Sequence, residues 1–292
     1  MDQFENDVEK KDHEESQIHP NNKLNELSAK QWISETVSVW RQKGLGSKHA
    51  DTKIEKQHPA PFSFTDVSRL IRFFTKSGEV VLDPFVGVGS TLKACAMENR
   101  KGIGFDLVPK YAYLAKERLE VEVRSLFPPE FSQDIVIGDA ERLIMGLPED
   151  SIDFVLTSPP YWNILHKKDH KVEQERIASD LDTKYSDSEL DLGNIPDYSD
   201  FLGKLSHVFG LCGKALKQGK YMSIIVSDFR HKSKYYMFHA DLANALMKYD
   251  LELKGITILY QTHKRVFPYG YPYAYVPNIH HQYILNLQNS KG

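Results

Sequence analysis

The chain has 292 residues, of which 41% are hydrophobic and 26% charged, and its formal net charge is −3 at pH 7. These proportions are ordinary for a soluble globular protein. No run of about 18 apolar residues is present, which excludes a helical membrane span, and the polar, acidic N-terminus is unlike a signal peptide. The cysteines Cys95 and Cys212 lack the spacing of a zinc site or a disulfide framework, so we predict a cytoplasmic protein with no metal site.

The N-terminal segment differs in composition from the rest of the chain. Residues 1–28 hold eight acidic and three basic side chains without periodicity, which predicts a disordered or loosely attached acidic tail. The remainder has a slight excess of basic residues, which can bind a polyanion if they cluster. We expect residues 29–287 to form a single domain that begins with a short helix over 29–41 and a loop over 42–60.

From residue 64 onward, apolar periodicity alternates between helix and strand. Strands that alternate with helices predict an α/β fold with a Rossmann-like, mostly parallel sheet of seven strands and helices on both faces. Only a loop joins the last two strands, so they should form an antiparallel hairpin at one edge. The predicted strands are 79–83, 102–106, 134–138, 152–157, 221–226, 253–261 and 282–287, and the predicted helices are 64–76, 90–99, a helix from 109, 198–217 and 235–249.

A loop with two glycines, Asp-Pro-Phe-Val-Gly-Val-Gly-Ser-Thr over 83–91, joins the first of these strands to a helix. Gly87 and Gly89 let a ligand approach the backbone, and the helix start offers unpaired N–H groups. Asp106 ends the next strand, where nucleotide-binding folds place the carboxylate that bonds ribose hydroxyls. A P-loop is excluded because no Gly-Lys-Ser/Thr follows, and Leu92 stands where the dinucleotide fingerprint needs a third glycine. The alternative is that the glycines only form a tight turn.

Further side chains around this loop are candidates for holding a nucleoside cofactor. Asp83 ends the strand before the loop, Phe85 lies within it, and Ser90 begins the next helix. Asp139 follows the third strand and can accept a hydrogen bond from an adenine amine, or it can cap the helix predicted after it. The two roles of Asp139 are compatible.

A second motif, Thr-Ser-Pro-Pro-Tyr-Trp over 157–162, follows an apolar strand. Its residues suit the methylation of an exocyclic amine, whose lone pair is delocalised into the ring. Ser158 Oγ and the Pro159 carbonyl can accept hydrogen bonds from the NH₂ group, and the rings of Pro159 and Pro160 hold the backbone rigid. Tyr161 can stack on the base, as aromatic side chains do on extruded bases. The alternative is an ordinary loop sequence followed by core aromatics.

Together the two motifs resemble those of the DNA methyltransferases that modify cytosine N4 or adenine N6. The resemblance covers roughly residues 29–287 and implies a class I methyltransferase fold, S-adenosyl-L-methionine as the cofactor and double-stranded DNA as the partner. The sequence His-Pro-Ala-Pro-Phe-Ser before the first strand implies that Pro59 and Phe62 line the cofactor pocket. The cofactor motif precedes the catalytic motif, so the chain looks like a circular permutation of the more common arrangement.

This family usually carries a separate target-recognition region, and no independent domain of that kind is evident in the sequence. Two segments are candidates: a polar insertion at 163–196, too long for a passive connection, and an aromatic and basic loop at 263–280, whose alternative is a rigid loop over the sheet edge. The side chains that we expect to contact DNA are Trp162, Asn163, Lys264, Arg265 and Tyr271. A cognate restriction endonuclease or partner subunit, and a monomeric or homodimeric state, are all compatible with the resemblance.

The residue before the two prolines bears on which amine is methylated. Serine there, with Trp162 after the tyrosine, resembles the cytosine-N4 enzymes more than the adenine-N6 enzymes, which more often carry Asp or Asn. We therefore expect a cytosine-N4-specific enzyme, with adenine N6 as the alternative. Cytosine-C5 methylation needs a cysteine nucleophile, commonly after proline, whereas Cys95 follows Ala94 and Cys212 follows Leu211. An RNA base methyltransferase and a catalytically silent DNA-binding homologue stay open.

Overall fold

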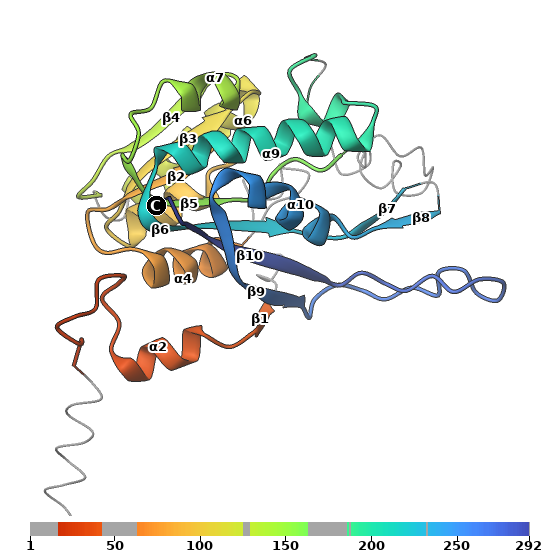
Figure 1. Ribbon diagram of the computed structural model, residues 1–292, viewed down its shortest axis with the longest axis horizontal. Coiled ribbons are helices and arrows are strands. Elements are labelled where there is room, and N and C mark those ends of the chain that lie inside the picture. The colour runs from red at the N-terminus through yellow and green to blue at the C-terminus, as the bar shows by residue number, and fades with distance from the viewer. Residues whose placement is uncertain are drawn as a thin grey trace, which may run out of the picture.

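The computed structural model describes residues 17–42, 63–124, 129–162, 186, 188–231 and 233–291. Within them, one sheet has the strand order β1-β9-β10-β6-β5-β2-β3-β4, and β7 pairs with β8 in a separate hairpin (Figure 1). The strands are β1 (Val39–Gln42), β2 (Val80–Asp83), β3 (Lys101–Asp106), β4 (Gln133–Ile137), β5 (Ile152–Thr157), β6 (Leu216–Val226), β7 (Phe229–His231), β8 (Lys234–Tyr236), β9 (Leu251–Gln261) and β10 (His281–Asn289). The helices are α2 (Ala29–Glu35), α4 (Phe64–Phe74), α5 (Ser90–Met97), α6 (Pro109–Leu119) with a π-helical extension (Glu120–Arg124), α7 (Ala140–Met145), a 3-10 helix (Leu192–Asn194), α9 (Tyr198–Ala215), α10 (Phe238–Leu246) and a second 3-10 helix (Met247–Tyr249).

The direction of the strands agrees with the sequence-based prediction. β10 runs antiparallel to both of its neighbours, β6 and β9, whereas the other neighbouring strands of the sheet run parallel. The predicted α/β fold with a mostly parallel sheet and a C-terminal antiparallel hairpin is therefore confirmed. The prediction that this hairpin forms the edge of the sheet is wrong, because β1 pairs with β9 on its outer side.

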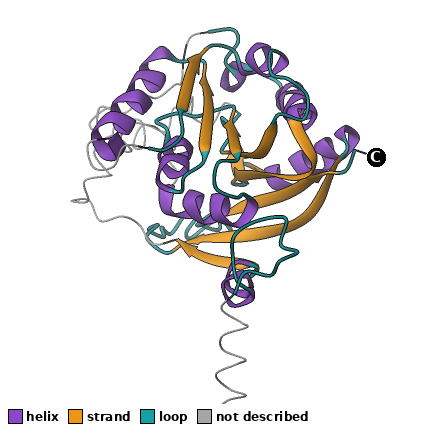
Figure 2. Ribbon diagram, turned by 90° about the vertical axis from the view of Figure 1, so that its left-hand side faces the viewer, coloured by secondary structure: helices purple, strands orange, loops and turns teal. Residues whose placement is uncertain are grey.

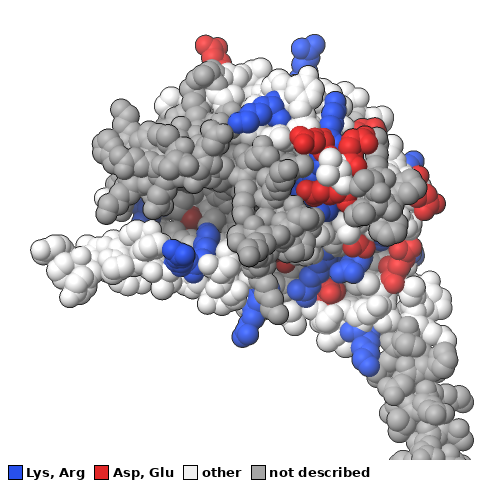
Figure 3. All heavy atoms as spheres, turned by 180° about the vertical axis from the view of Figure 1, so that it is seen from behind, with Lys and Arg blue, Asp and Glu red and all other residues white. Residues whose placement is uncertain are grey.

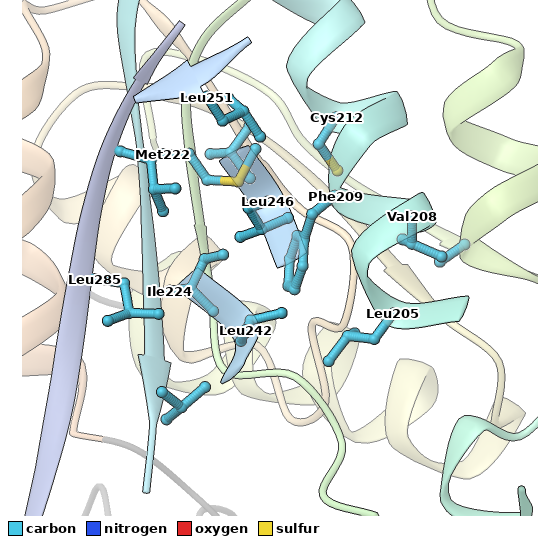
Figure 4. Close-up of a cluster of buried hydrophobic side chains, with 14 of the residues drawn as sticks. Leu205, Val208, Phe209, Cys212, Met222, Ile224, Leu242, Leu246, Leu251 and Leu285 are labelled. Atoms are coloured by element: carbon cyan, nitrogen blue, oxygen red, sulfur yellow. The ribbon is translucent and has the colours of Figure 1, made fainter. Parts of the chain in front are cut away.

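Helices cover both faces of the sheet (Figures 1 and 2). On one face, α4 buries Val67, Leu70, Ile71 and Phe74, whose helical spacing forms a single apolar stripe. On the other face, α9 and α10 pack their leucines against β6 and β10 (Figure 4). Each such buried side chain contributes about 1.5–3 kcal/mol to the free energy of unfolding. None of the helices in the described part of the chain is long and apolar enough to cross a membrane.

The sheet has one strand more than the seven predicted. The helix predicted over 29–41 ends at Glu35, and Val39–Gln42 forms β1 instead. Trp40 and Gln42 are buried while their neighbours are exposed, which is the alternation of a strand, but it extends over only four residues. β1 gains its hydrogen-bond partners from β9 near the other end of the chain, so local patterning did not reveal it.

Residues 17–28, predicted as part of the tail, pack against the body of the protein. Asn25 is completely buried, and its Nδ2 donates to the carbonyl oxygen of Phe73 at 2.6 Å. Ser28 begins α2 with a capping box to Gln31. This segment is held in place by hydrogen bonds from side chains to the backbone, and not by an apolar stripe. Its polar composition therefore led to the wrong prediction of a disordered tail. Residues 1–16 lie outside the described residues.

Beyond the sheet, the connection between β9 and β10 projects as a long arm, residues 262–280 (Figure 1). The side chain of Asn278 bonds both the N–H and the carbonyl oxygen of Phe267, each at 2.8 Å, and so ties the two sides of the arm together. Tyr271, Tyr273 and Tyr275 near the tip are 81%, 94% and 90% exposed. No acidic residue occurs in the arm.

Candidate functional site

Two glycines with positive φ shape the loop after β2. Gly87, with φ of 51°, donates its N–H to Asp106 Oδ2 at 2.9 Å. Gly89, with φ of 80°, precedes α5, and a Cβ atom there would come within 2.9 Å of Ala115 Cβ on α6. Gly89 is therefore required both by its backbone conformation and by the close packing of α6.

Asp106 lies at the end of β3, beside this loop. Its Oδ2 accepts from Gly87 and its Oδ1 accepts from the N–H of Val108 at 2.8 Å. Burial raises the pKa of Asp106 to about 6, and these two N–H donors oppose the increase. A carboxylate has about four acceptor positions, so Asp106 retains the capacity to bond a ligand.

A cavity of about 350 Å³ lies at the carboxyl ends of the parallel strands and brings the two sequence motifs together. Its lining includes Phe85 and Gly87 from the glycine loop, Asp106 from β3, and Ser158–Pro160 from the segment after β5. Ligands of open α/β sheets bind beyond the carboxyl ends of the strands, and their pockets measure roughly 300–1,000 Å³. The cavity therefore has the place and size of a small-molecule site.

Part of the lining comes from the segment predicted as an insertion. Glu189–Leu192 and Ile195 line the cavity, although no sequence pattern marked them as part of the site. Asp191 is buried, and its carboxylate accepts from Ser186 Oγ and from the N–H of Gly193, both at 2.9 Å. This Asp-x-Gly turn is the one local signal that could have indicated an ordered segment. Residues 163–185 and 187 lie outside the described residues.

The catalytic motif begins where the fully buried strand β5 ends. Ser158, Pro159 and Pro160 line the cavity, whereas Tyr161 does not. The centroid of the Tyr161 ring lies 6.2 Å from that of the Phe238 ring. Burial raises the pKa of Tyr161 to about 12, so its phenol is neutral at physiological pH.

Asp83 occupies a different place from the one predicted. It is completely buried, does not line the cavity, and accepts hydrogen bonds from Thr157 Oγ1 at 2.6 Å, from Thr91 Oγ1 and from the N–H of Phe85. Its role is therefore to join the glycine loop to the end of β5 rather than to contact a cofactor. Burial raises the pKa of Asp83 to about 6.

Trp162 is 5% exposed and packs in an aromatic cluster with Tyr198, Phe229 and Tyr236. Its indole N–H donates to the carbonyl oxygen of Ile195 at 2.8 Å, which links the catalytic motif to the segment that lines the cavity. This burial contradicts the prediction that Trp162 contacts DNA.

The other predicted residues divide into three groups. Asp139 lines the cavity and also caps α7 by accepting from the N–H of Arg142 at 3.1 Å, so both roles considered for it are available. Gly89 packs against Ala115 of α6, and Ser90 Oγ accepts from Arg118 at 3.0 Å; neither residue lines the cavity, and their assignment to cofactor binding stays a prediction. The predicted site residues that lie outside the described residues are Pro59, Phe62 and Asn163.

The candidates for DNA contact in the arm are exposed. Lys264 and Arg265 lie where the arm leaves the sheet, and Tyr271 lies near its tip. In Figure 3 the arm projects on the left as a surface without acidic side chains. None of these three residues lines the cavity, so they form a separate surface.

Residues 2–117 match the family model described as DNA methylase, of the N6/N4 type, a stretch that contains the glycine loop and ends before the catalytic motif. The orphan methyltransferase M.BamHII of Bacillus amyloliquefaciens is 34% identical over 111 residues, which are 38% of this chain and 40% of that protein. The type II methyltransferase M.HpaI of Haemophilus parainfluenzae is 30% identical over 150 residues, which are 51% of this chain and 43% of that protein. The chain therefore spans less than half the length of these curated relatives.

Among solved structures, a chain of the complex that contains the Haloferax volcanii Trm112 methyltransferase activator aligns with a TM-score of 0.50. It is 13% identical, and the alignment covers 83% of this chain and 93% of that chain. At this identity the likeness concerns the fold alone, and it agrees with the α/β architecture described above.

Proposed function

We propose that the chain is a DNA methylase of the N6/N4 type, the family whose model and relatives it matches, and that it transfers a methyl group from S-adenosyl-L-methionine to the exocyclic N4 amine of cytosine in DNA. The observation that carries this proposal is the single cavity lined by the glycine loop, by Asp106 and by Ser158–Pro160. Methyl transfer between two bound groups depends mainly on their positioning, and one cavity shared by both motifs supplies it.

The residues of the cavity fit S-adenosyl-L-methionine, the cofactor of this family. Asp106 offers acceptor oxygens to the ribose hydroxyls, and Asp139 offers one to the adenine amine. Phe85 supplies apolar surface. Pro59 and Phe62 lie outside the described residues, and their part in cofactor binding stays a prediction from the sequence. When bound, the cofactor supplies an electrophilic methyl group on its sulfonium.

At the amine site, the chain's own groups act as hydrogen-bond acceptors. In the proposal, Ser158 Oγ and the Pro159 carbonyl accept from the NH₂ group and draw it toward a tetrahedral geometry, which frees its lone pair for attack on the methyl group. The proline rings fix the backbone and so the direction of the carbonyl. Tyr161 stacks on the base, and no covalent intermediate with the protein is needed.

Cytosine N4 is the preferred target because serine precedes the two prolines and Trp162 follows the tyrosine. The second candidate is adenine N6, since the same acceptors can serve an adenine amine. RNA as substrate, or a silent homologue that binds DNA without methylating it, are the remaining alternatives.

The first experiment is to incubate the chain with methyl-labelled S-adenosyl-L-methionine and mixed-sequence duplex DNA, digest the DNA to nucleosides and identify the labelled one by mass spectrometry. We expect labelled N4-methyldeoxycytidine. Labelled N6-methyldeoxyadenosine would retain the reaction type and reject the base assignment. A parallel incubation with RNA distinguishes an RNA enzyme from a silent homologue, which labels neither nucleic acid.

Asp106→Ala should weaken the binding of S-adenosyl-L-methionine by about 1–3 kcal/mol, the range for hydrogen bonds to a charged group. In the wild type, affinity should also fall as the pH drops below about 6, because protonated Asp106 loses acceptor capacity. Titration calorimetry between pH 5 and 8 measures both effects. The pH dependence should be weaker in Asp106→Asn, and an unchanged affinity in Asp106→Ala would reject the ribose assignment.

For the DNA partner, we propose that the arm is the element that contacts the duplex. Lys264 and Arg265 supply positive charge at its base, and the exposed tyrosines supply surfaces for stacking or hydrogen bonds. The lack of acidic residues in the arm is favourable for approach to phosphates.

The variant Lys264→Ala/Arg265→Ala should bind duplex DNA more weakly and should show a smaller salt dependence. If both residues neutralise phosphates, the slope of log K against log[salt] should decrease by about 2, since each contact contributes roughly 0.9. Fluorescence anisotropy at several salt concentrations measures the slope. The matched control is Lys248→Ala/Lys254→Ala near the opposite end of β9, which should keep the wild-type slope. Equal slopes in both variants would exclude phosphate contact by the arm.

A further inference from the structure

The short hairpin of β7 and β8 follows β6 directly and carries basic and aromatic side chains. Lys234 and Tyr235 are exposed, and Arg230 is half-buried. The guanidinium carbon of Arg230 lies 5.5 Å from the ring centroid of Tyr235. The ammonium of Lys234 lies 4.9 Å from the ring centroid of Tyr236. No acidic residue occurs in the sequence from 229 to 240, so the hairpin has a positive charge that no carboxylate of its own offsets.

The carboxylate directly before the hairpin, that of Asp228, points into the protein. Asp228 is 4% exposed, and its Oδ2 accepts from the hydroxyl of Tyr235 at 3.1 Å. Its Oδ1 accepts from the backbone N–H of His239 at 3.2 Å and lies 2.7 Å from Nδ1 of the same residue. These contacts fix the hairpin at the start of β7 and at the start of α10, and they keep the carboxylate away from the basic surface.

The catalytic motif packs against the hairpin through its last residue, Trp162. The ring centroid of Trp162 lies 4.7 Å from that of His231 and 5.5 Å from that of Tyr236. It also lies 6.2 Å from that of Phe229, which stacks on Tyr236 with centroids 5.2 Å apart. Aromatic clusters of this kind bury a large area and hold their members in one geometry. The hairpin is therefore held at a fixed position relative to the motif that begins at Thr157.

The hairpin and the arm leave the same edge of the sheet, at the right of Figure 1. Ser227 lies between the end of β6 and the hairpin, and its Oγ lies 3.3 Å from the carbonyl oxygen of His281. His281 begins β10, where the arm returns to the sheet, and β10 pairs with β6. The bases of the two projections are therefore adjacent, and both lie beside the end of the strand that precedes the catalytic motif.

We propose that the hairpin of β7 and β8 is a second surface for duplex DNA, at which Arg230 and Lys234 bind phosphates next to the extruded target base. This inference rests on the proposed function, because that function brings DNA to the catalytic motif. An enzyme that acts on an extruded base holds the nucleotide out of the stack, so the phosphates beside it lie close to the active site. Basic side chains there neutralise these phosphates. In Figure 1 the arm projects further than the hairpin, so in this proposal it contacts the duplex farther from the base.

The first test is Lys234→Ala in the full chain, with the affinity for mixed-sequence duplex DNA measured by fluorescence anisotropy at several salt concentrations. If Lys234 binds one phosphate, the slope of log K against log[salt] should decrease by about 0.9. The matched control is Lys248→Ala, beyond the other end of α10, because that ammonium also lies 4.9 Å from a tyrosine ring centroid, that of Tyr249. The control should keep the wild-type slope. An unchanged slope in Lys234→Ala would overturn the proposal.

A crosslinking measurement tests the same surface without removing a charge. Cys95 and Cys212 are both buried, so a benzophenone maleimide should react with a cysteine introduced at the surface. Ser233→Cys, in the turn between β7 and β8, should crosslink to labelled duplex DNA on irradiation. Met247→Cys, at a position that is 68% exposed in the native chain, should not. Crosslinking from neither position, or equally from both, would contradict the proposal.

Comparison with the methyl-transfer assay separates this inference from the proposed function. If the Ser233→Cys conjugate crosslinks to duplex DNA but the wild type labels no nucleoside, the hairpin surface is retained and the methyl transfer is rejected. If the wild type labels DNA and the conjugate does not crosslink, the function is retained and the hairpin surface is rejected. Crosslinking to RNA in place of duplex DNA rejects DNA as the partner of this surface.

Discussion

Tyr161→Ala should lower the rate of methyl transfer about five- to 150-fold while leaving the affinity for S-adenosyl-L-methionine nearly unchanged. Stacking of an aromatic side chain on a base is worth about 1–3 kcal/mol by alanine substitution, which corresponds to this range. Tyr161 does not line the cavity shared by the glycine loop and Ser158–Pro160, so removal of its ring leaves the proposed cofactor contacts in place. Transfer of labelled methyl groups gives the rate, and calorimetry gives the affinity.

A matched control for this substitution is Tyr221→Ala. Tyr221 is also half-buried, and its ring centroid lies 4.9 Å from that of Phe74. Phe74 belongs to α4, so this contact lies on the face of the sheet that α4 covers. This control should lower the free energy of unfolding without a comparable loss of rate per folded molecule. Equal losses of rate and cofactor affinity in Tyr161→Ala would contradict the separate roles assigned to the two motifs.

Asp83→Ala should lower the free energy of unfolding by about 3–5 kcal/mol, because it leaves several buried donors without an acceptor. The side chains of Thr157 and Thr91 and the N–H of Phe85 all bond this carboxylate. Since these donors belong to the glycine loop, to α5 and to the end of β5, cofactor affinity and methyl transfer should fall as well. Urea unfolding measures the stability, and calorimetry under folding conditions measures the affinity.

The control for Asp83 is Asp153→Ala at the opposite end of β5. Asp153 is also buried, accepts from the N–H of Val80 at 3.0 Å and pairs with Lys217 at 2.8 Å. Its loss should likewise destabilise the fold, but it should leave cofactor affinity per folded molecule unchanged. If Asp83→Ala also retained full affinity, the role of Asp83 in joining the two motifs would be rejected.

The raised pKa of Asp83 adds a pH dependence with a definite sign. Between its ordinary value of 3.8 and about 6, the folded protein binds more protons at Asp83 than the unfolded chain does. The stability contributed by the neutral form is thus complete below about pH 4 and is lost as the pH rises through about 6. The difference in unfolding free energy between wild type and Asp83→Asn should therefore shift in favour of the wild type between pH 7 and pH 5. A difference that does not change with pH would exclude this titration.

Much of the fold was accessible from local sequence patterns. The segment Ile152–Thr157 was predicted with the observed ends because it is a short apolar run between turn residues, and α4 was predicted from its apolar stripe. The strand β1 and the hairpin of β7 and β8 were missed, because each strand has only three or four residues and depends on a partner strand. These strands were missed because they are too short for a periodic pattern, and not because their residue types are unusual for strands.

For the candidate site, some of the predicted residues line the cavity and others do not. Asp106 and Ser158–Pro160 were placed by their positions after strands, and the structure brings them to one cavity. Asp83 and Trp162 have the same kind of position but face inward. The lining residues at 189–195 were missed because they follow a long polar stretch and carry no pattern of their own.

By itself, the sequence determined the order of the longer strands and helices along the chain and the location of both motifs. These follow from hydrophobic periodicity and from the backbone requirements of glycine and proline, which are local properties. Only the tertiary structure decided which side chains of each motif face the cavity, and that β1 joins the sheet beside β9. Those outcomes depend on strand register and on contacts between residues up to 220 positions apart, which no local pattern encodes.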